Sequence, residues 1–121
     1  MKALQCVELG GPEKLEINEV EAPSAIPGHV VIDVKSGSIN FPDVLMIQGL
    51  YQYQPPLPFT PGGESAGVIS EVGEGVTKFK VGDKVFAMTG VGAFAEKILA
   101  AEASCMAIPD SMDYDSAAAL S

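Results

Sequence analysis

Basic residues are scarce in this sequence, which has seven Lys and Arg against sixteen Asp and Glu and a formal net charge of −9. Such a surface repels polyanions, so we expect no nucleic acid and no anionic membrane among its partners. Long apolar runs are also missing, because none approaches the roughly 20 residues that span a bilayer. The N-terminal segment soon becomes polar, unlike a secretory signal. These absences predict a cytoplasmic protein.

Residues that bind metals or form disulfides are equally few. The two cysteines, Cys6 and Cys105, lie at opposite ends of the chain without paired spacing, which indicates neither a disulfide framework nor a zinc knuckle. We expect both to be small buried hydrophobic residues. The single histidine, His29, precedes a β run and is expected at the surface, and the carboxylates are scattered. The inventory therefore predicts no metal site.

What the sequence does contain is typical of one globular domain, with 47% apolar and 19% charged residues in 121 positions. Short apolar runs alternate with glycine- and proline-rich breaks, which is the pattern of strands joined by turns. The predicted strands are Lys2–Leu9, Leu15–Val20, Val30–Val34, Ser65–Val72, Lys84–Met88 and Phe94–Leu99. The composition and spacing predict a mainly β fold, a compact barrel with short helices.

One short helix is predicted over residues 40–49. Pro42 suits a first helical turn, Asp43 suits the positive helix start, and Gly49 suits the stop. The following residues, 51–61, are dense in proline and cannot donate a regular ladder of backbone hydrogen bonds. We expect this stretch to be a loop.

The final residues, 109–121, change in character from aspartates and serines to alanines, which predicts the beginning of a helix. A helix that short has no stability of its own, and its sequence offers no amphipathic face to bury. We therefore expect the chain to be a piece of a longer protein.

Gly90–Ala95 matches the G-x-G-x-x-A pattern of dinucleotide-binding sites, and Asp113 lies at a suitable distance for an acid that binds ribose. Such a site also needs a helix directly after the glycines, whereas residues 94–99 have the pattern of a strand. We interpret this match as coincidental.

The segment Val68–Val85 resembles the signature of the medium-chain dehydrogenase/reductase superfamily. Its companion segments, in the family's order, are Asn40–Asp43, Pro61–Gly67 and Ala93–Glu96. The resemblance implies that residues 1–121 form a GroES-like catalytic domain, a partly open β-barrel as in the N-terminal domain of alcohol dehydrogenases. It also implies that 109–121 begins the connection to a Rossmann domain that lies outside the chain, with the active cleft between the two domains.

Within that superfamily the chain resembles the zinc-independent quinone oxidoreductases. Metal-dependent members have a cysteine at the position of Asn40 and a histidine at the position of Gly63, whereas Glu64 is retained. A brief connection, Thr89–Gly92, stands where many alcohol dehydrogenases carry a lobe that holds structural zinc. The resemblance implies NADPH as cofactor, no zinc, and a homodimer formed by the full-length protein.

The resemblance assigns the catalytic roles to Asn40, beside the nicotinamide end of the cofactor, and Tyr51, in the substrate cleft. A tyrosine with a pKa of about 10 stays protonated at neutral pH and can hydrogen-bond an oxygen that gains negative charge. We also expect Tyr53, Phe59 and Glu64 to line the substrate pocket. Other readings stay open from the residues alone, since Asn40 is a good helix cap and Tyr51 suits either core or surface.

The expected activity is hydride transfer from NADPH to a small-molecule quinone or enone. One alternative is a 2-enoyl thioester reductase, because Met46–Tyr51 resembles the segment that carries the catalytic tyrosine of that group. Against it, a chain with a net charge of −9 has little positive charge to bind a coenzyme A phosphate. An alternative of another class is a free-standing GroES-like binding module without chemistry. In the first two cases we expect the chain alone to be inactive, since half of the cleft wall is missing.

Overall fold

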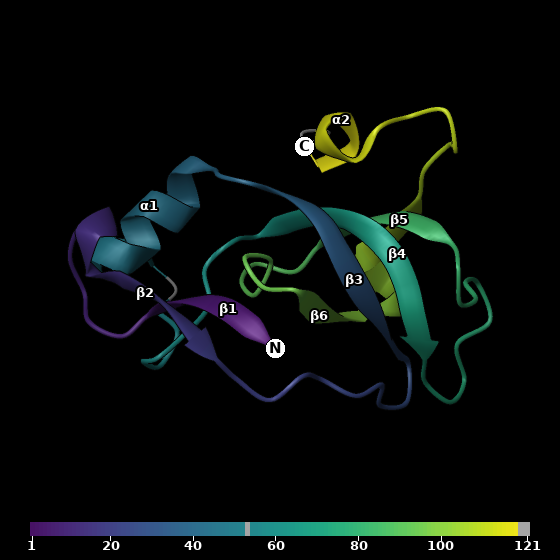
Figure 1. Cartoon of the computed structure of the whole chain (residues 1–121), viewed down its shortest axis with the longest axis horizontal. Coiled ribbons are helices and arrows are strands. Elements are labelled where there is room, and N and C mark those ends of the chain that lie inside the picture. Colours follow the sequence, from purple (N-terminus) through teal and green to yellow (C-terminus); the bar gives the residue numbers. More distant parts are fainter. Residues whose placement is uncertain (53, 119–121) are drawn as a thin grey trace.

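An antiparallel five-stranded sheet forms the centre of the computed structural model, which describes residues 1–52 and 54–118 (Figure 1). Its strands, in the order β6-β3-β4-β5-β7, are β6 (Lys97–Ala101), β3 (His29–Ser38), β4 (Glu64–Val72), β5 (Lys84–Met88) and β7 (Cys105–Ala107). A second sheet pairs β1 (Lys2–Cys6) with β2 (Leu15–Glu19). Neither sheet closes on itself, and this confirms the predicted mainly β, partly open architecture.

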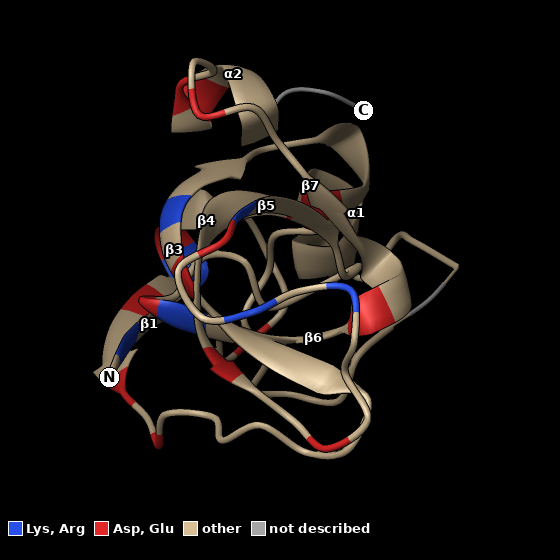
Figure 2. Ribbon diagram, turned by 90° about the vertical axis from the view of Figure 1, so that its right-hand side faces the viewer, with Lys and Arg blue, Asp and Glu red and all other residues tan. Residues whose placement is uncertain are grey.

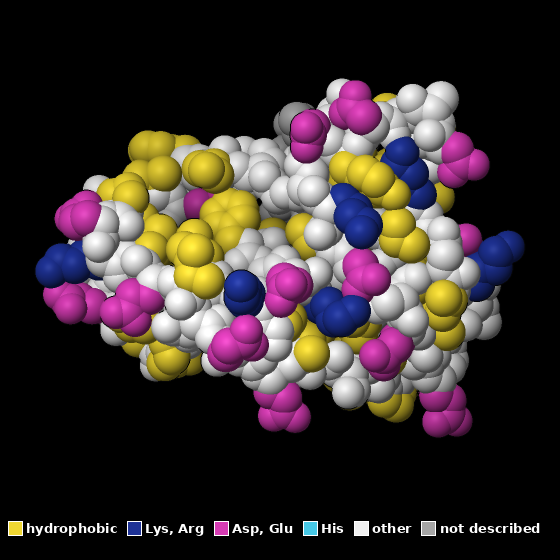
Figure 3. All heavy atoms as spheres, viewed as in Figure 1, with side chains coloured by type: hydrophobic (Ala, Val, Ile, Leu, Met, Phe, Trp, Pro, Cys, Tyr) yellow, Lys and Arg dark blue, Asp and Glu magenta, His cyan; other side chains and the backbone are white. Residues whose placement is uncertain are grey.

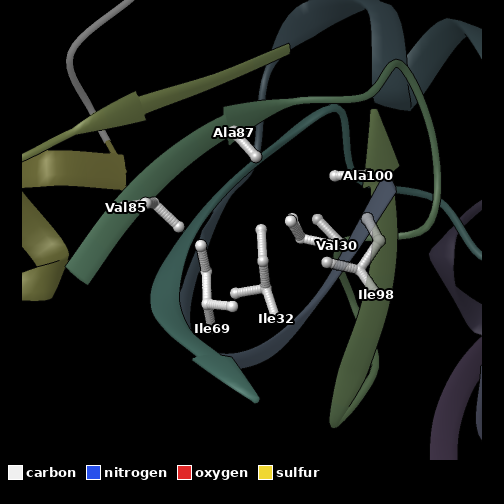
Figure 4. Close-up of a cluster of buried hydrophobic side chains, with 8 residues drawn as sticks. Val30, Ile32, Ile69, Val85, Ala87, Ile98 and Ala100 are labelled. Atoms are coloured by element: carbon white, nitrogen blue, oxygen red, sulfur yellow. The ribbon is translucent and has the colours of Figure 1, made fainter. Parts of the chain in front are cut away.

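The main core lies on the concave side of the sheet, where Figure 4 shows side chains from four strands pointing toward one another. Successive residues of a strand face opposite sides, so Val30 and Ile32 of β3 enter this core together. Both are fully buried, and Ile69 from β4 and Val85 from β5 pack against them. The short apolar runs that predicted these strands therefore supply the residues of the core.

Ile32→Val is expected to lower the free energy of unfolding by about 1 kcal/mol, because a buried methylene is lost from a close-packed site. The side chain of Ile32 is 0% exposed, whereas that of Ile17 on β2 is 73% exposed. Ile17→Val is the matched control and should change the free energy of unfolding by less than about 0.5 kcal/mol. Urea denaturation of the two variants measures both values, and equal losses would contradict the assignment of this core.

Helix α1 (Phe41–Gln48) begins and ends where the sequence predicts. Asn40 is its N-cap in an extended conformation, and Gly49 ends it with a left-handed φ of 75°, which glycine adopts without a steric penalty. The inner face of the helix places Met46 and Ile47 in a second core cluster. This packing fixes the helix against β1.

Helix α2 (Tyr114–Ala118) corrects one expectation, that the helix near the end of the chain has no face to bury. Ala117 and Ala118 are 0% and 2% exposed and pack against Ala66 and Phe86 of the sheet. Small side chains let the helix backbone approach the sheet closely, and tertiary packing supplies the stability that a short helix lacks. Figure 1 shows α2 lying over one side of the sheet.

Several boundaries differ from the sequence prediction. β6 begins at Lys97, so that Phe94 lies in the turn before it, and β7 was missed because it has only three residues. Two 3-10 turns, Pro12–Lys14 and Glu102–Ser104, were not predicted either. No helix in the described part of the chain is long and apolar enough to cross a membrane.

The two cysteines differ in burial. Cys6 is 0% exposed, as predicted, whereas Cys105 is only half-buried at the start of β7. Partial burial nevertheless raises the pKa of the Cys105 thiol to about 11, with a smaller contribution from the charge of Glu102. The thiol is therefore protonated and unreactive at neutral pH. His29 is half-buried as the first residue of β3, rather than fully at the surface.

Charged side chains are spread over the surface, whereas apolar ones are densest at one end of the face seen in Figure 3. Acidic residues are distributed over strands, loops and α2, with few basic residues among them (Figure 2). Hydrophobic side chains gather over α1 and the β1–β2 pair on the face seen in Figure 3. Exposed Ile17 and Ile39 belong to this end, being 73% and 74% exposed. On this face the apolar surface is therefore densest around α1.

Candidate active site

The candidate site begins at the place where β3 ends and β4 begins. Ser38, the last residue of β3, pairs with Glu64, the first residue of β4. Asn40 follows two residues after Ser38, so the pairing brings its side chain close to Glu64. The side-chain nitrogen of Asn40 donates a hydrogen bond to Oε1 of Glu64 at 2.5 Å. Two residues that are 24 positions apart in the sequence thereby form one unit.

Asp43 holds the backbone of this unit. Its Oδ2 accepts a hydrogen bond from the backbone N–H of Asn40 at 2.8 Å, which is half of a capping box at the start of α1. The side chain is 5% exposed, and burial raises the pKa of its carboxyl. Hydrogen bonds from the backbone at Asn40, Gly62 and Gly63 act in the opposite direction, while the charge of Glu64 raises the pKa further. Asp43 therefore fixes the backbone of Asn40 in addition to favouring the helix dipole, the role that we expected for it.

A hollow of about 460 Å³ opens beside this unit. Its walls combine the polar side chains of the unit with apolar ones, and the lining residues are Asn40, Pro42, Asp43, Met46, Tyr51, Gly63, Glu64, Met88 and Gly90. Tyr51 comes from the segment directly after α1 and is half-buried on the wall. A concave, largely apolar site with a few convergent polar groups is the usual form of a small-molecule site.

Glu64 has an unsatisfied oxygen in this site. The residue is 8% exposed, and its Oε2 is buried without a hydrogen-bond partner among the described residues. A buried polar atom without a partner costs about 1–3 kcal/mol. The described residues supply no partner for this oxygen, so a partner has to come from the side of the hollow.

The predicted site residues fall into three groups. Asn40, Tyr51 and Glu64 line one hollow, although the sequence places them on three separate segments. Phe59 corrects a prediction: it is 7% exposed, packs with Cys6 in the second core cluster, and does not line the hollow. Its backbone pairs with that of Cys6, which turns the side chain inward. Tyr53 lies outside the described residues.

The structure also adds lining residues that the sequence analysis missed. Met46 and Met88 form apolar walls, and Pro42 lines the hollow from the first turn of α1. A methionine on a strand or helix is most often a core residue, so the residue type alone did not indicate that these methionines line a ligand site. The position of Met88 opposite Glu64 in the β4–β5 pairing is what brings it to the site.

The glycine motif at residues 90–95 forms a turn that leads into β6. Gly90 and Gly92 both have positive φ angles, of 84° and 99°, and a strand follows them instead of a helix. This confirms that the match to a dinucleotide-binding pattern is coincidental. The turn instead forms part of the hollow, because Gly90 is one of the lining residues. The backbone N–H of Thr89 donates a hydrogen bond to the carbonyl of Gly63 at 2.8 Å and so fixes the turn to the start of β4.

Replacing Asp43 by Asn is expected to remove one contribution to stability that decreases as the pH rises. The pKa of this carboxyl is raised above its ordinary value of 3.8, so the folded chain holds the proton more tightly than the unfolded chain does. Its contribution to stability is therefore greatest at low pH and is lost as the pH rises through the folded-state pKa. The free energy of unfolding of Asp43→Asn, minus that of the wild type, should increase with pH across this window.

Urea titrations between about pH 3 and pH 7 measure this difference. The carboxyl groups far from Asp43 titrate alike in both proteins and cancel in the comparison, whereas Glu64, whose charge interacts with that of Asp43, contributes to the difference. A difference that stays constant over the whole range would show that burial does not shift the pKa of Asp43.

An open antiparallel barrel with a polar hollow at the junction of β3, α1 and β4 defines the class of GroES-like domains. Residues 26–110 match the alcohol dehydrogenase GroES-like domain, and the chain belongs to this family. The resemblance to the quinone oxidoreductases within the medium-chain dehydrogenases/reductases is also confirmed.

Among curated proteins, the chain is 39% identical to the rat synaptic vesicle membrane protein VAT-1 homolog, over 97% of this chain and 30% of that protein. It is 38% identical to rat quinone oxidoreductase, over 99% of this chain and 37% of that protein. The crystal structure of Escherichia coli quinone oxidoreductase complexed with NADPH has a TM-score of 0.93 at 30% identity, over 99% of this chain and 37% of that chain. The chain thus spans about a third of the length of these relatives.

Proposed function

We propose that this chain forms the catalytic wall of an NADPH-dependent, zinc-independent oxidoreductase that transfers hydride to a quinone or another α,β-unsaturated carbonyl compound. The oxidoreductase class follows from its homologues, which include quinone oxidoreductases. The observation that carries the finer proposal is the hollow that gathers Asn40, Tyr51 and Glu64. The remaining wall and most of the cofactor site would come from the rest of a longer protein.

In this proposal the residues of the chain position and stabilise, while reduced nicotinamide, when bound, supplies the hydride. Asn40 contacts the nicotinamide end of the cofactor, at the rim of the hollow. Tyr51 donates a hydrogen bond to the acceptor oxygen, which gains an electron pair and negative charge as the hydride arrives at the ring or at the enone β-carbon. One hydride and one proton convert the quinone to a hydroquinone, and Tyr51 or water supplies the proton.

Zinc independence is argued from the donor atoms at the site. Asn40 offers a neutral amide and Gly63 has no side chain, where the metal-dependent relatives have cysteine and histidine. Zinc sites in proteins are built from thiolate, imidazole and carboxylate ligands. Within the described ranges, 1–52 and 54–118, no three His, Cys, Asp or Glu side chains are grouped as metal ligands would be. We therefore propose that the Tyr51 hydroxyl, rather than a metal, polarises the acceptor.

The test is carried out on a full-length protein that contains this chain, purified in the presence of a chelator. Oxidation of NADPH is followed with 1,2- and 1,4-quinones and with crotonyl coenzyme A. Quinone turnover that survives chelation supports the proposal, whereas preference for the thioester identifies a 2-enoyl thioester reductase. Silence with every acceptor would favour a binding role without chemistry, a reading that the similarity to the VAT-1 homolog also makes worth testing.

The chain of 121 residues alone is expected to oxidise NADPH at less than about 1% of the full-length rate, because the pyrophosphate and adenosine have no docking surface. The measurement uses both proteins at equal concentration with the same quinone. Comparable rates would show that the described hollow is a complete active site.

A further inference from the structure

We infer that Glu64 is a positioning residue whose role is to hold the side-chain amide of Asn40 in one of its two orientations. The inference rests on the proposed function, in which Asn40 contacts the nicotinamide end of the cofactor. It adds that Glu64 determines whether the oxygen or the nitrogen of the Asn40 amide faces the ligand.

The two ends of an asparagine side chain have opposite hydrogen-bonding character. Its oxygen accepts hydrogen bonds and its nitrogen donates them, so a rotation by 180° reverses the pattern that a ligand meets. A carboxylate only accepts. The contact of 2.5 Å between Asn40 Nδ2 and Glu64 Oε1 therefore selects the orientation with nitrogen toward β4.

Both members of this contact are held by the fold. Glu64 is the first residue of β4 and pairs with Ser38 of β3 and Met88 of β5, so its backbone lies in the interior of the sheet. The backbone of Asn40 is fixed independently by Asp43, through the hydrogen bond of 2.8 Å. Asp43 thus fixes the backbone of Asn40, and the hydrogen bond to Glu64 then holds its side-chain amide.

The environment shows that Glu64 is not placed there to stabilise the fold. The residue is more than nine-tenths buried, and the residues that line the hollow include no Lys, Arg or His to pair with its carboxylate. The nearby charged group is Asp43, of the same sign. One of its two oxygens has no partner. A buried carboxylate with one neutral partner lowers stability relative to an apolar residue, so its use at this position fits the control of Asn40.

A swap of the two side-chain types tests this inference. Asn40→Asp alone places two carboxylates face to face and should lower kcat for quinone reduction about 100-fold, with KM for the quinone within about twofold. In Glu64→Gln alone, two amides face each other, and either one can donate the hydrogen bond to the other. This variant should lower kcat by a smaller factor than Asn40→Asp does. The double variant restores one donor and one acceptor with their direction reversed, and should regain at least about tenfold in kcat over Asn40→Asp.

A second readout uses this chain without cofactor or substrate and so does not depend on the proposed function. In ¹⁵N-edited NMR spectra the side-chain amide protons of Asn40 should exchange with solvent at least about tenfold more slowly than those of exposed Gln48 on the same helix. Glu64→Gln should remove most of this protection, while thermal unfolding verifies that the variant is folded. Equal exchange of Asn40 and Gln48 in the wild type would overturn the inference.

The two readouts separate the two hypotheses. If the full-length protein reduces none of the acceptors, the proposed function fails, while protection of the Asn40 amide still supports its orientation by Glu64. If the protein is active but the double variant recovers nothing over Asn40→Asp although it is folded, Glu64 does not position Asn40.

Discussion

Replacing Tyr51 by Phe is expected to lower kcat/KM for quinone reduction by the full-length protein about 100-fold, the usual cost of removing one donor to a developing oxyanion. The ring of Tyr51 is half-buried on the wall of the hollow, and Phe keeps that packing while it removes the hydroxyl. The dissociation constant of NADPH should stay within about twofold, because the hydroxyl is proposed to contact the acceptor and not the cofactor. Steady-state kinetics and fluorescence titration with NADPH give the two values.

The matched control is Tyr114→Phe in α2. Tyr114 is also half-buried, and its ring lies 4.5 Å from the Lys84 ammonium, outside the residues that line the hollow. Removal of its hydroxyl should leave kcat/KM within about twofold of the wild-type value. Equal losses in both variants, or none in Tyr51→Phe, would show that Tyr51 does not stabilise the reacting oxygen.

A large effect on stability is expected from Gly67→Ala, which should cost at least about 3 kcal/mol in the free energy of unfolding. A Cβ atom at this position would lie 2.1 Å from the backbone oxygen of Asp33 and 2.9 Å from Cγ2 of Ile32. Gly67 lies in the central strand β4, between Val34 of β3 and Val85 of β5. The backbone of β3 cannot move away without losing hydrogen bonds and core contacts, so the clash is not relieved.

Gly75→Ala separates this steric effect from the conformational preference of glycine. Gly75 has a φ of 85°, and a Cβ there would meet nothing within 4 Å. The expected loss is about 1 kcal/mol, from the left-handed backbone alone. Chemical denaturation of both variants measures the difference, and similar losses would mean that β3 and β4 separate easily at Gly67.

Most of the secondary structure could be predicted from local signals. β5 was predicted with its observed bounds because turn residues on both sides interrupt a short apolar run. Asn40 and Gly49 marked the limits of α1, since a cap and a left-handed stop require particular residue types. These features depend on neighbours in the sequence, which pattern analysis can use.

The remaining features depend on contacts between distant residues. The pairing of Ser38 with Glu64 joins Asn40 to its partner, and no local pattern indicates that register. Phe59 was assigned to the pocket because it lies on the proline-rich loop, but its pairing with Cys6 turns it into the core. Likewise, two alanines of α2 are buried only because a sheet surface lies against them.

The two proposed functional groups are carried by different kinds of structure, and this difference has an evolutionary consequence. Asn40 is held by the paired ends of β3 and β4, whereas Tyr51 stands in the irregular segment that follows Gly49. Tyr51 itself takes no part in the pairing of β3 with β4. Under the proposed function, a lineage of such proteins can change the compound that it reduces by altering residues after Gly49, while it retains the contact proposed between Asn40 and the nicotinamide.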